Sequence, residues 1–515
     1  MSKIPEIHLC IQQPAGYVHA LGLRDQARYF SYQFRRLGVH VTVAKNRLRH
    51  DAVNFVFGAH LGFDASLRER HACVFVNLEQ LGQGGAPVPK AYMTLLANSA
   101  VVDYDPDNCA AYASVGYEMP VAPLLFAPYL KPAQAIALAD RPIDLLFIGG
   151  MNERRKAWIE RIEALGLNVT VFDEALYADE RDEFIVRSKA VLNAHFYESS
   201  RFEQARVAHC LSLGTPVISE RNAQTRPHAA FEDSVLWLEG EQLEQFFAED
   251  FGTPACYALM GEALARFEKV ADPIEAYADL LAFAAGFVDA HHAKRPAEAW
   301  QPERINLGSG KDYKVGWLNL DVIDRAEPDL LLDLAAPLTL PLVADSITAG
   351  PLRLEEGSIA LINANNVLEH VADLPALMGN CLRLLKTDGE FHIEVPYERA
   401  LTAWQDPTHV RAMNENSWVY YTDWFWYLGW FEHRFQVERS SYLDMQLNEC
   451  AREQAAFMRM VLRKVETTLK ERTIARTLQP DLRLPEDAVD ARYMYRPPAA
   501  VPEPAPMLRA QGLAA

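Results

Sequence analysis

Residues 308–310 read Gly-Ser-Gly, follow a short apolar run at 305–307, and form the pattern best suited to ligand binding. A strand that ends in Gly-x-Gly lets the backbone turn sharply and approach a ligand, with the next helix N-terminus facing it. Tyr313 stands where a dinucleotide fold would have a third glycine, which disfavours a nicotinamide cofactor. Asp321 ends the next predicted strand, where a carboxylate can accept hydrogen bonds from both hydroxyls of a ribose. The alternative, a plain turn, loses weight because this acid is in register.

Several further segments follow in a fixed order. Residues 316–321 read Gly-Trp-Leu-Asn-Leu-Asp, 367–370 read Val-Leu-Glu-His, and 385–390 read Leu-Lys-Thr-Asp-Gly-Glu before a strand that ends in Val-Pro. Over about 304–444 this series resembles the class I S-adenosylmethionine-dependent methyltransferases.

The resemblance implies a Rossmann-like domain with S-adenosylmethionine as its cofactor. The residues that it places around the cofactor are Gly308, Ser309, Gly310, Asp321, Asp333, Asn365 and Asn366. The glycine loop would pass under the methionine end. The first aspartate would hold the ribose and the second would lie near the adenine. The two asparagines would face the methionine and the sulfonium.

Side chains that can move a proton lie in the loop after the strand that ends at Pro396. This loop falls at the carboxyl edge of a parallel sheet, where ligands bind. We predict His409 as the general base that removes a hydroxyl proton, with Asp406 as its orienting partner. The alternative is that this pair only ties down a polar loop. For Glu369 and His370, the simpler interpretation is that they fix the start of the following helix.

The first half of the chain carries a different pattern. Residues 201–220 resemble the helix–glycine–strand segment of two-lobed (GT-B) glycosyltransferases, and 143–155 resemble the first strand and loop of their nucleotide-binding lobe. The likeness extends over about 7–291.

The signature acids of retaining glycosyltransferases are not in place. The positions that hold two glutamates in those enzymes are Arg201 and His209 here, and Glu203 is out of that register. Arg206 stands eight residues before Gly214, where a related branch has an arginine that can meet a diphosphate. A nucleotide sugar is therefore the predicted ligand, with Arg206 and Glu203 as candidate binding residues. An ion pair between Arg206 and a neighbouring acid is the alternative.

Three series of alternating strands and helices predict an α/β protein, with two Rossmann-like lobes followed by a Rossmann-like methyltransferase domain. The predicted parts are a first lobe at 1–140, a second at 141–291, a linker at 292–303, the methyltransferase domain at 304–446, a long helix at 447–476 and a disordered tail at 496–515.

Composition limits the partners. The 515 residues include 50 Lys and Arg against 69 Asp and Glu, a formal charge of −19, which disfavours nucleic acid. No apolar run reaches the roughly 20 residues of a membrane span. The seven cysteines are scattered without Cys-x-x-Cys, which favours reduced thiols in a cytoplasmic protein and predicts no metal site.

These patterns favour an enzyme that methylates a hydroxyl of a saccharide or glycan, with an N-terminal half that transfers or binds the sugar. A methyltransferase acting on a non-sugar small molecule or peptide, with that half as a binding module, is the main alternative. A scaffold with two degenerate nucleotide folds is a third. The oligomeric state stays open, a homo-oligomer included.

Overall fold

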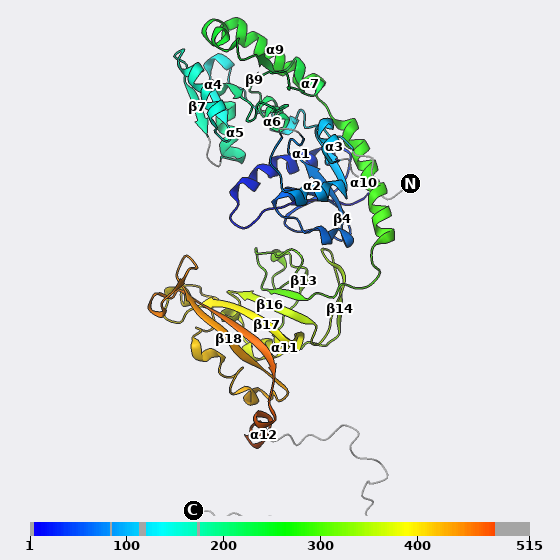
Figure 1. Cartoon of the computed structure of the whole chain (residues 1–515), viewed down its shortest axis with the longest axis vertical. Coiled ribbons are helices and arrows are strands. Elements are labelled where there is room, and N and C mark those ends of the chain that lie inside the picture. The colour runs from blue at the N-terminus through cyan, green and yellow to red at the C-terminus, as the bar shows by residue number, and fades with distance from the viewer. Residues whose placement is uncertain (1–4, 83–84, 113–119, 173–175, 479–515) are drawn as a thin grey trace, which may run out of the picture.

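The computed structural model describes residues 5–82, 85–112, 120–172 and 176–478. Three α/β units lie one after another along the long axis of the molecule (Figure 1). The first lobe, in blue, lies between the second lobe, in cyan and green, and the third domain, in yellow and orange. The predicted α/β class with Rossmann-like units is confirmed. In the described part of the chain, no helix is both long and apolar enough to cross a bilayer. The tail predicted at 496–515 lies outside the described residues.

The first lobe is a parallel five-stranded sheet with the order β2-β1-β3-β4-β5. Its strands are β1 (Ile7–Ile11), β2 (Val41–Lys45), β3 (Val53–Phe57), β4 (Ala72–Asn77) and β5 (Ala100–Asp103). Its helices are α1 (Leu23–Arg36), α2 (Lys90–Ala97) and α3 (Pro106–Tyr112). Every residue of β1, β3, β4 and β5 is buried, as expected for parallel strands covered on both faces.

The second lobe repeats this arrangement in a parallel sheet with the order β10-β9-β8-β6-β7. Its strands are β6 (Ile143–Ile148), β7 (Val169–Phe172), β8 (Ser188–Asn193), β9 (Val217–Glu220) and β10 (Leu236–Leu238). Its helices are α4 (Glu153–Glu163), α5 (Ala178–Val186), α6 (Gln204–Ser212), α7 (Ala229–Glu232), α8 (Leu243–Gln245) and α9 (Pro254–Val270).

Helix α10 (Ile274–Lys294) runs from the second lobe back to the first (Figure 1). Its buried residues Tyr277, Leu280 and Ala284 belong to the apolar core of the first lobe. The prediction placed this segment in the second lobe because position along the chain was the only guide. The structure corrects that boundary: the end of 141–291 belongs to the first lobe.

The third domain has a mixed sheet with the order β13-β12-β11-β16-β17-β20-β18-β19. Its strands are β11 (Arg304–Leu307), β12 (Leu318–Asp321), β13 (Leu330–Leu331), β16 (Ile359–Asn365), β17 (Leu385–Pro396), β18 (His433–Leu443), β19 (Glu449–Cys450) and β20 (Phe457–Glu466). Strands β13, β12, β11, β16 and β17 are parallel, and β20, β18 and β19 continue the sheet in antiparallel pairs. Helix α11 (Leu374–Leu384) connects β16 to β17, and β14 (Leu342–Ser346) pairs with β15 (Gly350–Leu354) in a separate hairpin.

The long helix predicted at 447–476 is wrong. Most of this segment forms β19 and β20, and only α12 (Leu469–Leu478) is helical. Met458, Met460 and Leu462 alternate into the core of the third domain, and β20 pairs along its length with β17 and β18. The apolar residues at 457–465 fit either period, and the two neighbouring strands decide the outcome. The third domain therefore extends to Glu466, beyond the predicted end at 446.

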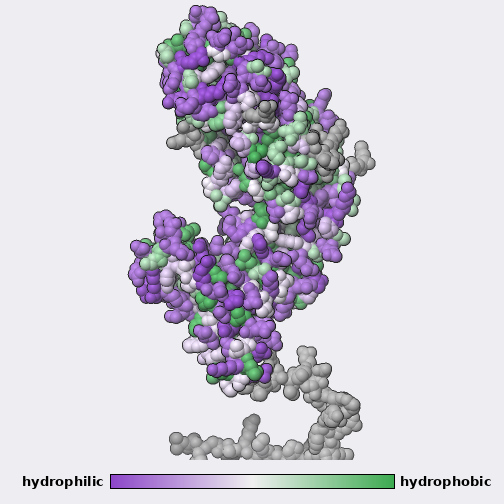
Figure 2. All heavy atoms as spheres, in the orientation of Figure 1, coloured by the Kyte–Doolittle hydropathy of each residue, from purple (hydrophilic) through white to green (hydrophobic). Residues whose placement is uncertain are grey.

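The first lobe and the third domain are joined by hydrogen bonds. His71 Nε2 lies 2.8 Å from the carbonyl oxygen of Thr348, and Arg70 Nη2 donates to that of Ala349 over 2.9 Å. Trp300, in the predicted linker, exchanges backbone hydrogen bonds of 2.7 and 2.8 Å with strand β15. Part of the 292–303 segment is thus built into the third domain. Figure 2 shows a mainly hydrophilic surface that is hollowed on one side where the two units meet.

Candidate active site

The strand order of the third sheet identifies where a ligand binds. The chain goes from β11 outward to β12 and β13, then returns to β16 on the other side of β11. In open α/β sheets, ligands bind outside the carboxyl ends of the strands where the order reverses in this way. The loops at that point follow β11, at 308–312, and β16, at 366–370.

The loop after β11 needs both of its glycines. Gly308 has φ +62° and Gly310 has φ +46°, in the left-handed region that glycine enters at little cost. A Cβ atom on Gly308 would lie 2.4 Å from Cγ2 of Val367, a residue of the loop after β16. The two loops are thus in direct contact, and the predicted glycine loop is placed against the second loop of the same edge.

Asp321, at the end of β12, holds the glycine loop. Its Oδ2 accepts a hydrogen bond from the backbone N–H of Gly310 over 2.8 Å, and its Oδ1 accepts one from Ile323 over 2.9 Å. The hydroxyl of Ser309 is buried between these strands and has no hydrogen-bond partner among the described residues. This unpaired hydroxyl and the remaining lone pairs of the carboxylate are available to a ligand.

The other predicted cofactor residues lie along the same edge. Asp333 follows β13, is exposed, and accepts a hydrogen bond from the N–H of Ala335 over 2.8 Å. Asn365 ends β16 and is exposed. Asn366 has φ +51°, and its N–H donates to the carbonyl of Glu394 over 2.8 Å. Carboxyl ends of neighbouring parallel strands therefore bring all seven predicted residues to one edge of the sheet.

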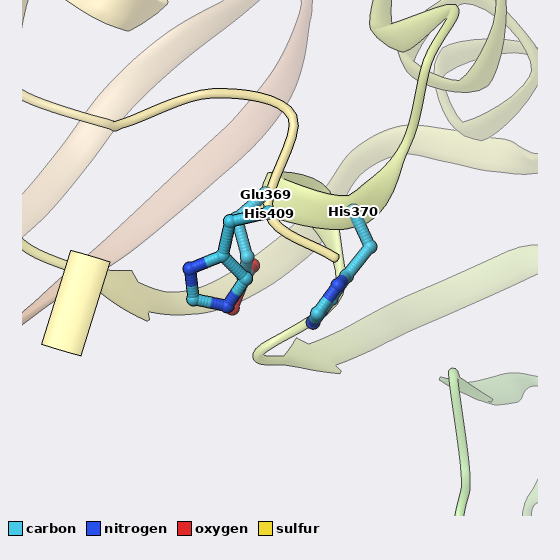
Figure 3. Close-up of side chains that lie close together, drawn as sticks. All are labelled: Glu369, His370 and His409. Atoms are coloured by element: carbon cyan, nitrogen blue, oxygen red, sulfur yellow. The ribbon is translucent and has the colours of Figure 1, made fainter. Parts of the chain in front are cut away.

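A cluster that the sequence did not predict as a unit lies beside this edge. Glu369 and His370 belong to the short turn Leu368–His370 after β16, and His409 reaches them from the loop after β17 (Figure 3). His409 Nε2 lies 4.0 Å from Glu369 Oε1, and the two histidine rings meet edge to face at 4.7 Å. Glu369 is only 1% exposed, and burial raises the pKa of its carboxyl group to about 7.

Asp406 does not orient His409 as predicted. Its Oδ1 accepts hydrogen bonds from the N–H and the hydroxyl of Thr408, at 2.8 and 2.6 Å. His409 Nδ1 lies instead 3.0 Å from the carbonyl oxygen of Ala403. The carboxylate that faces the imidazole is Glu369. A sequence motif does not indicate a bond to a backbone carbonyl such as that of Ala403. It also does not indicate Glu369, which is distant in sequence and is brought to His409 by the fold.

Glu369 and His370 do not fix the start of helix α11 either. Asp373 caps that helix, because its side chain accepts a hydrogen bond from the N–H of Ala376 over 3.0 Å. Because Asp373 caps the helix, Glu369 and His370 are not needed for that purpose and can take part in a functional site. The only sequence signal for this cluster was the Glu369-His370 pair, which lies two residues after Val367 on the loop that contacts Gly308.

A second candidate site lies where the strand order of the second lobe reverses, between β6 and β8. Gly149, just after β6, has φ +146°, and a Cβ atom there would lie 3.0 Å from Nη2 of Arg206. Arg206 donates from Nη1 to Oδ1 of Asn193 over 3.2 Å. Among the described residues it forms no ion pair within 4.0 Å, so the alternative of a direct ion pair is not supported.

Glu203 lies beside Arg206 and is tied into the lobe. Its Oε2 is 2.9 Å from Nδ1 of His195 and 3.0 Å from Nδ2 of Asn193. Arg155 approaches the other oxygen at 3.5 Å. Burial raises the pKa of Glu203, but the bond to His195 and the two arginine charges outweigh it and lower the pKa to about 2. Glu203 is therefore a fixed negative charge within ion-pair distance of Arg155.

Comparison with known proteins gives similar folds for parts of the chain. An S-adenosylmethionine dependent methyltransferase from Mesorhizobium loti is 15% identical with a TM-score of 0.21, over 34% of this chain and 96% of its own. One from Archaeoglobus fulgidus is 12% identical with a TM-score of 0.22, over 32% and 86%. AviGT4, a glycosyltransferase involved in avilamycin A biosynthesis, is 14% identical with a TM-score of 0.32, over 54% and 98%. No protein-family model and no curated protein matches the chain. These likenesses concern the fold alone, and the function rests on the residues of the site.

Proposed function

We propose that the third domain transfers a methyl group from S-adenosylmethionine to a hydroxyl of a saccharide. The N-terminal half holds or transfers a sugar carried on a nucleotide diphosphate. The observation that carries the methyl-transfer proposal is the glycine loop, which Val367 and Asp321 fix at the point where the strand order reverses.

The residues at this edge fit the cofactor. Asp321 has lone pairs left for ribose hydroxyls after it has accepted two backbone hydrogen bonds. The buried hydroxyl of Ser309 needs a partner that the described residues do not supply. Asp333 would lie toward the adenine, and Asn365 and Asn366 toward the methionine end. When bound, S-adenosylmethionine supplies an electrophilic methyl group, so most of the rate can come from positioning the acceptor.

His409 is the proposed acceptor of the hydroxyl proton. A carbonyl oxygen only accepts hydrogen bonds, so the contact with Ala403 places a hydrogen on Nδ1, and in the neutral imidazole Nε2 then carries the lone pair. That lone pair faces Glu369 beside the glycine loop. We expect His409→Ala to slow methyl transfer by about 10²–10⁴-fold. Cofactor affinity should stay unchanged, because the proposed cofactor contacts lie on other loops.

A cavity supports a saccharide as the acceptor. It measures about 400 Å³ and is lined by residues that follow β1 and β2 of the first lobe, among them Gln12 and Asn46, and by Lys311–Tyr313 of the third domain. The carboxyl edge of the first sheet therefore opens next to the glycine loop. The same β1 loop continues to His19, whose Nδ1 lies 2.8 Å from the hydroxyl of Tyr177 in the second lobe. A sugar held by the N-terminal half would lie close to the methyl-transfer site.

In the second lobe, Arg206 and Arg155 are the groups that would meet a diphosphate beside the space left by Gly149. Glu203 would hold Arg155 in place, Asn193 would hold Arg206, and Glu203 is not proposed to act on the sugar itself. The acids of retaining glycosyltransferases are absent from their positions, which favours sugar binding over sugar transfer by that route.

The test of the methyl-transfer proposal uses the full chain. Calorimetry with S-adenosylmethionine and S-adenosylhomocysteine is expected to give one binding site. Labelled methyl transfer is then measured with oligosaccharides and nucleotide sugars, and in parallel with peptides and simple hydroxyl compounds. Label on the saccharides supports the proposal, and label only on a peptide or simple compound replaces the acceptor class. Failure of both cofactor forms to bind would refute the methyltransferase assignment.

A further inference from the structure

Three side chains with metal-ligating atoms converge beside the glycine loop. Glu369 and His370 come from the turn after β16 and His409 from the loop after β17 (Figure 3). Each offers one ligand atom, and these atoms all lie within 4.8 Å of one another. Val367, two residues before Glu369, touches Gly308, so the cluster borders the proposed cofactor site.

Both imidazoles are held with the same nitrogen free. His409 donates from Nδ1 to the carbonyl oxygen of Ala403, 3.0 Å away. His370 Nδ1 lies 2.9 Å from the hydroxyl oxygen of Thr408. That hydroxyl gives its own hydrogen to Asp406 over 2.6 Å, so its oxygen accepts from His370. In the neutral imidazole, each Nε2 then carries a lone pair. Metal-binding histidines usually have their other nitrogen fixed in this way, by a carbonyl or through a carboxylate.

Glu369 adds an independent indication of a ligand. It is 1% exposed, and neither carboxylate oxygen has a hydrogen-bond partner among the described residues. One oxygen faces the free lone pair of His409 at 4.0 Å. Two electron-pair donors that face each other across such a gap in a buried place need a proton or a cation between them.

We propose that Glu369, His370 and His409 bind a divalent first-row transition-metal cation such as Zn²⁺. Two imidazoles and one carboxylate are a known donor set for such ions, and three protein ligands leave a position open. Bonds of about 2.0–2.2 Å require the three side chains to close in by small rotations. No zinc signature is visible in the sequence, because the ligands come from two loops that only the fold brings together.

The site deepens the proposed function, and its role depends on it. An acceptor hydroxyl that binds at the open position would lose its proton to solvent, helped by the charge of the cation. The oxygen lone pair then forms the bond to the methyl carbon as the carbon–sulfur bond breaks, and the sulfur leaves as a neutral thioether. In this arrangement His409 is a ligand and not the proton acceptor.

Metal binding is tested on the untagged full chain after dialysis against EDTA. Titration with ZnCl₂ in competition with a chromophoric chelator is expected to reveal a tight site, and Co²⁺ should give the visible absorption of a low-symmetry complex. Glu369→Gln and His409→Ala should each weaken this binding by about 100-fold or more, and Thr408→Val by about 10-fold through His370. His392→Ala is the matched control, because His392 Nε2 also lies near a carboxylate, 2.7 Å from Glu390, but outside the cluster.

Circular dichroism and melting temperature establish that each variant is folded. The site would be overturned if Glu369→Gln and His409→Ala bound Zn²⁺ with the wild-type affinity. It would also be overturned if the wild-type chain did not bind Zn²⁺. Methyl transfer that proceeds equally with and without EDTA would overturn the catalytic role while the proposed function stands. A chain that binds Zn²⁺ at this cluster but binds no S-adenosylmethionine would refute the proposed function and leave the metal site in place.

Discussion

Gly308→Ala is expected to weaken cofactor binding, because this position has no space for a Cβ atom and has a backbone angle that L-residues rarely adopt. The φ of +62° costs an L-residue roughly 1–2 kcal/mol. The new Cβ would stand 2.4 Å from Cγ2 and 3.2 Å from Cγ1 of Val367, and overpacking of this kind adds about 1–3 kcal/mol. The loop relieves this strain by moving away from Val367, so affinity falls at least about tenfold, or 1.4 kcal/mol.

Two comparisons separate the contact from the backbone strain. Gly316→Ala is the matched control, because Gly316 has φ +77° and nothing within 4 Å of its Cβ position. It should lose stability through the backbone angle alone and keep its cofactor affinity. Val367→Ala in the Gly308→Ala background removes both Cγ atoms and should restore part of the affinity, as a favourable coupling in the double-mutant cycle.

Calorimetry with S-adenosylhomocysteine measures the affinities of the wild-type chain, the three single variants (Gly308→Ala, Gly316→Ala and Val367→Ala) and the double variant, and thermal unfolding establishes that each variant is folded. If the cofactor affinity of Gly308→Ala were within twofold of that of Gly316→Ala, the close contact between Gly308 and Val367 would not be required for binding. A loss that Val367→Ala fails to reduce would assign the effect to the backbone angle and not to the clash.

Three further predictions concern other parts of the chain. Asp321→Asn should weaken cofactor binding about tenfold in calorimetry, since a charge-assisted hydrogen bond contributes about 1.5–3 kcal/mol, whereas exposed Asp324→Asn should not; equal affinities would refute the ribose role. A nucleoside diphosphate should raise the melting temperature of the full chain and Arg206→Ala should abolish the rise; no rise with the unchanged chain would argue for a non-binding lobe. Burial lowers the pKa of His8 from 6.5 to about 4. The folding stability is therefore unaffected by His8 above pH 6.5, and it decreases by about 3 kcal/mol as the pH falls from 6.5 toward 4, because the unfolded chain takes up the proton more readily. His8→Gln should therefore flatten the acid side of the melting-temperature profile, and an unchanged profile would contradict this.

The fold could be predicted wherever local pattern and tertiary partner agree. Strands β1, β3 and β4 are buried along their whole length and consist mostly of apolar residues because both faces are covered, and their helices are separated from them by glycine or polar turns. Strand β20 could not be predicted, because its apolar residues fit a helix equally well until β17 and β18 are known to flank it. The segment of helix α10 was assigned to the wrong lobe, since its partner surface is distant in sequence.

The site divides in the same way. The glycine loop and Asp321 were predicted because glycine spacing and strand ends are local features, and they lie 2.8 Å apart through the N–H of Gly310. The partner of His409 was not, because Glu369 and His409 are forty residues apart and the oriented nitrogen bonds a backbone carbonyl. A motif gives residue types, and the contact between the β16 and β17 loops gives their geometry.

Polar groups that the fold leaves unpaired point to the same edge of the third sheet. Glu369 is the carboxylate with two buried, unpartnered oxygens in the described part of the chain, and Ser309 has a buried hydroxyl without a partner. Leaving such groups unpaired is unfavourable, most of all for a carboxylate, and stable folds seldom keep them without a ligand. One of them lies on the loop after β11, and the other lies in the turn after β16 that contacts this loop through Val367. Their shared position, at the reversal of strand order where ligands bind, argues that both are completed by bound molecules: Ser309 by the proposed cofactor and Glu369 by the proposed cation.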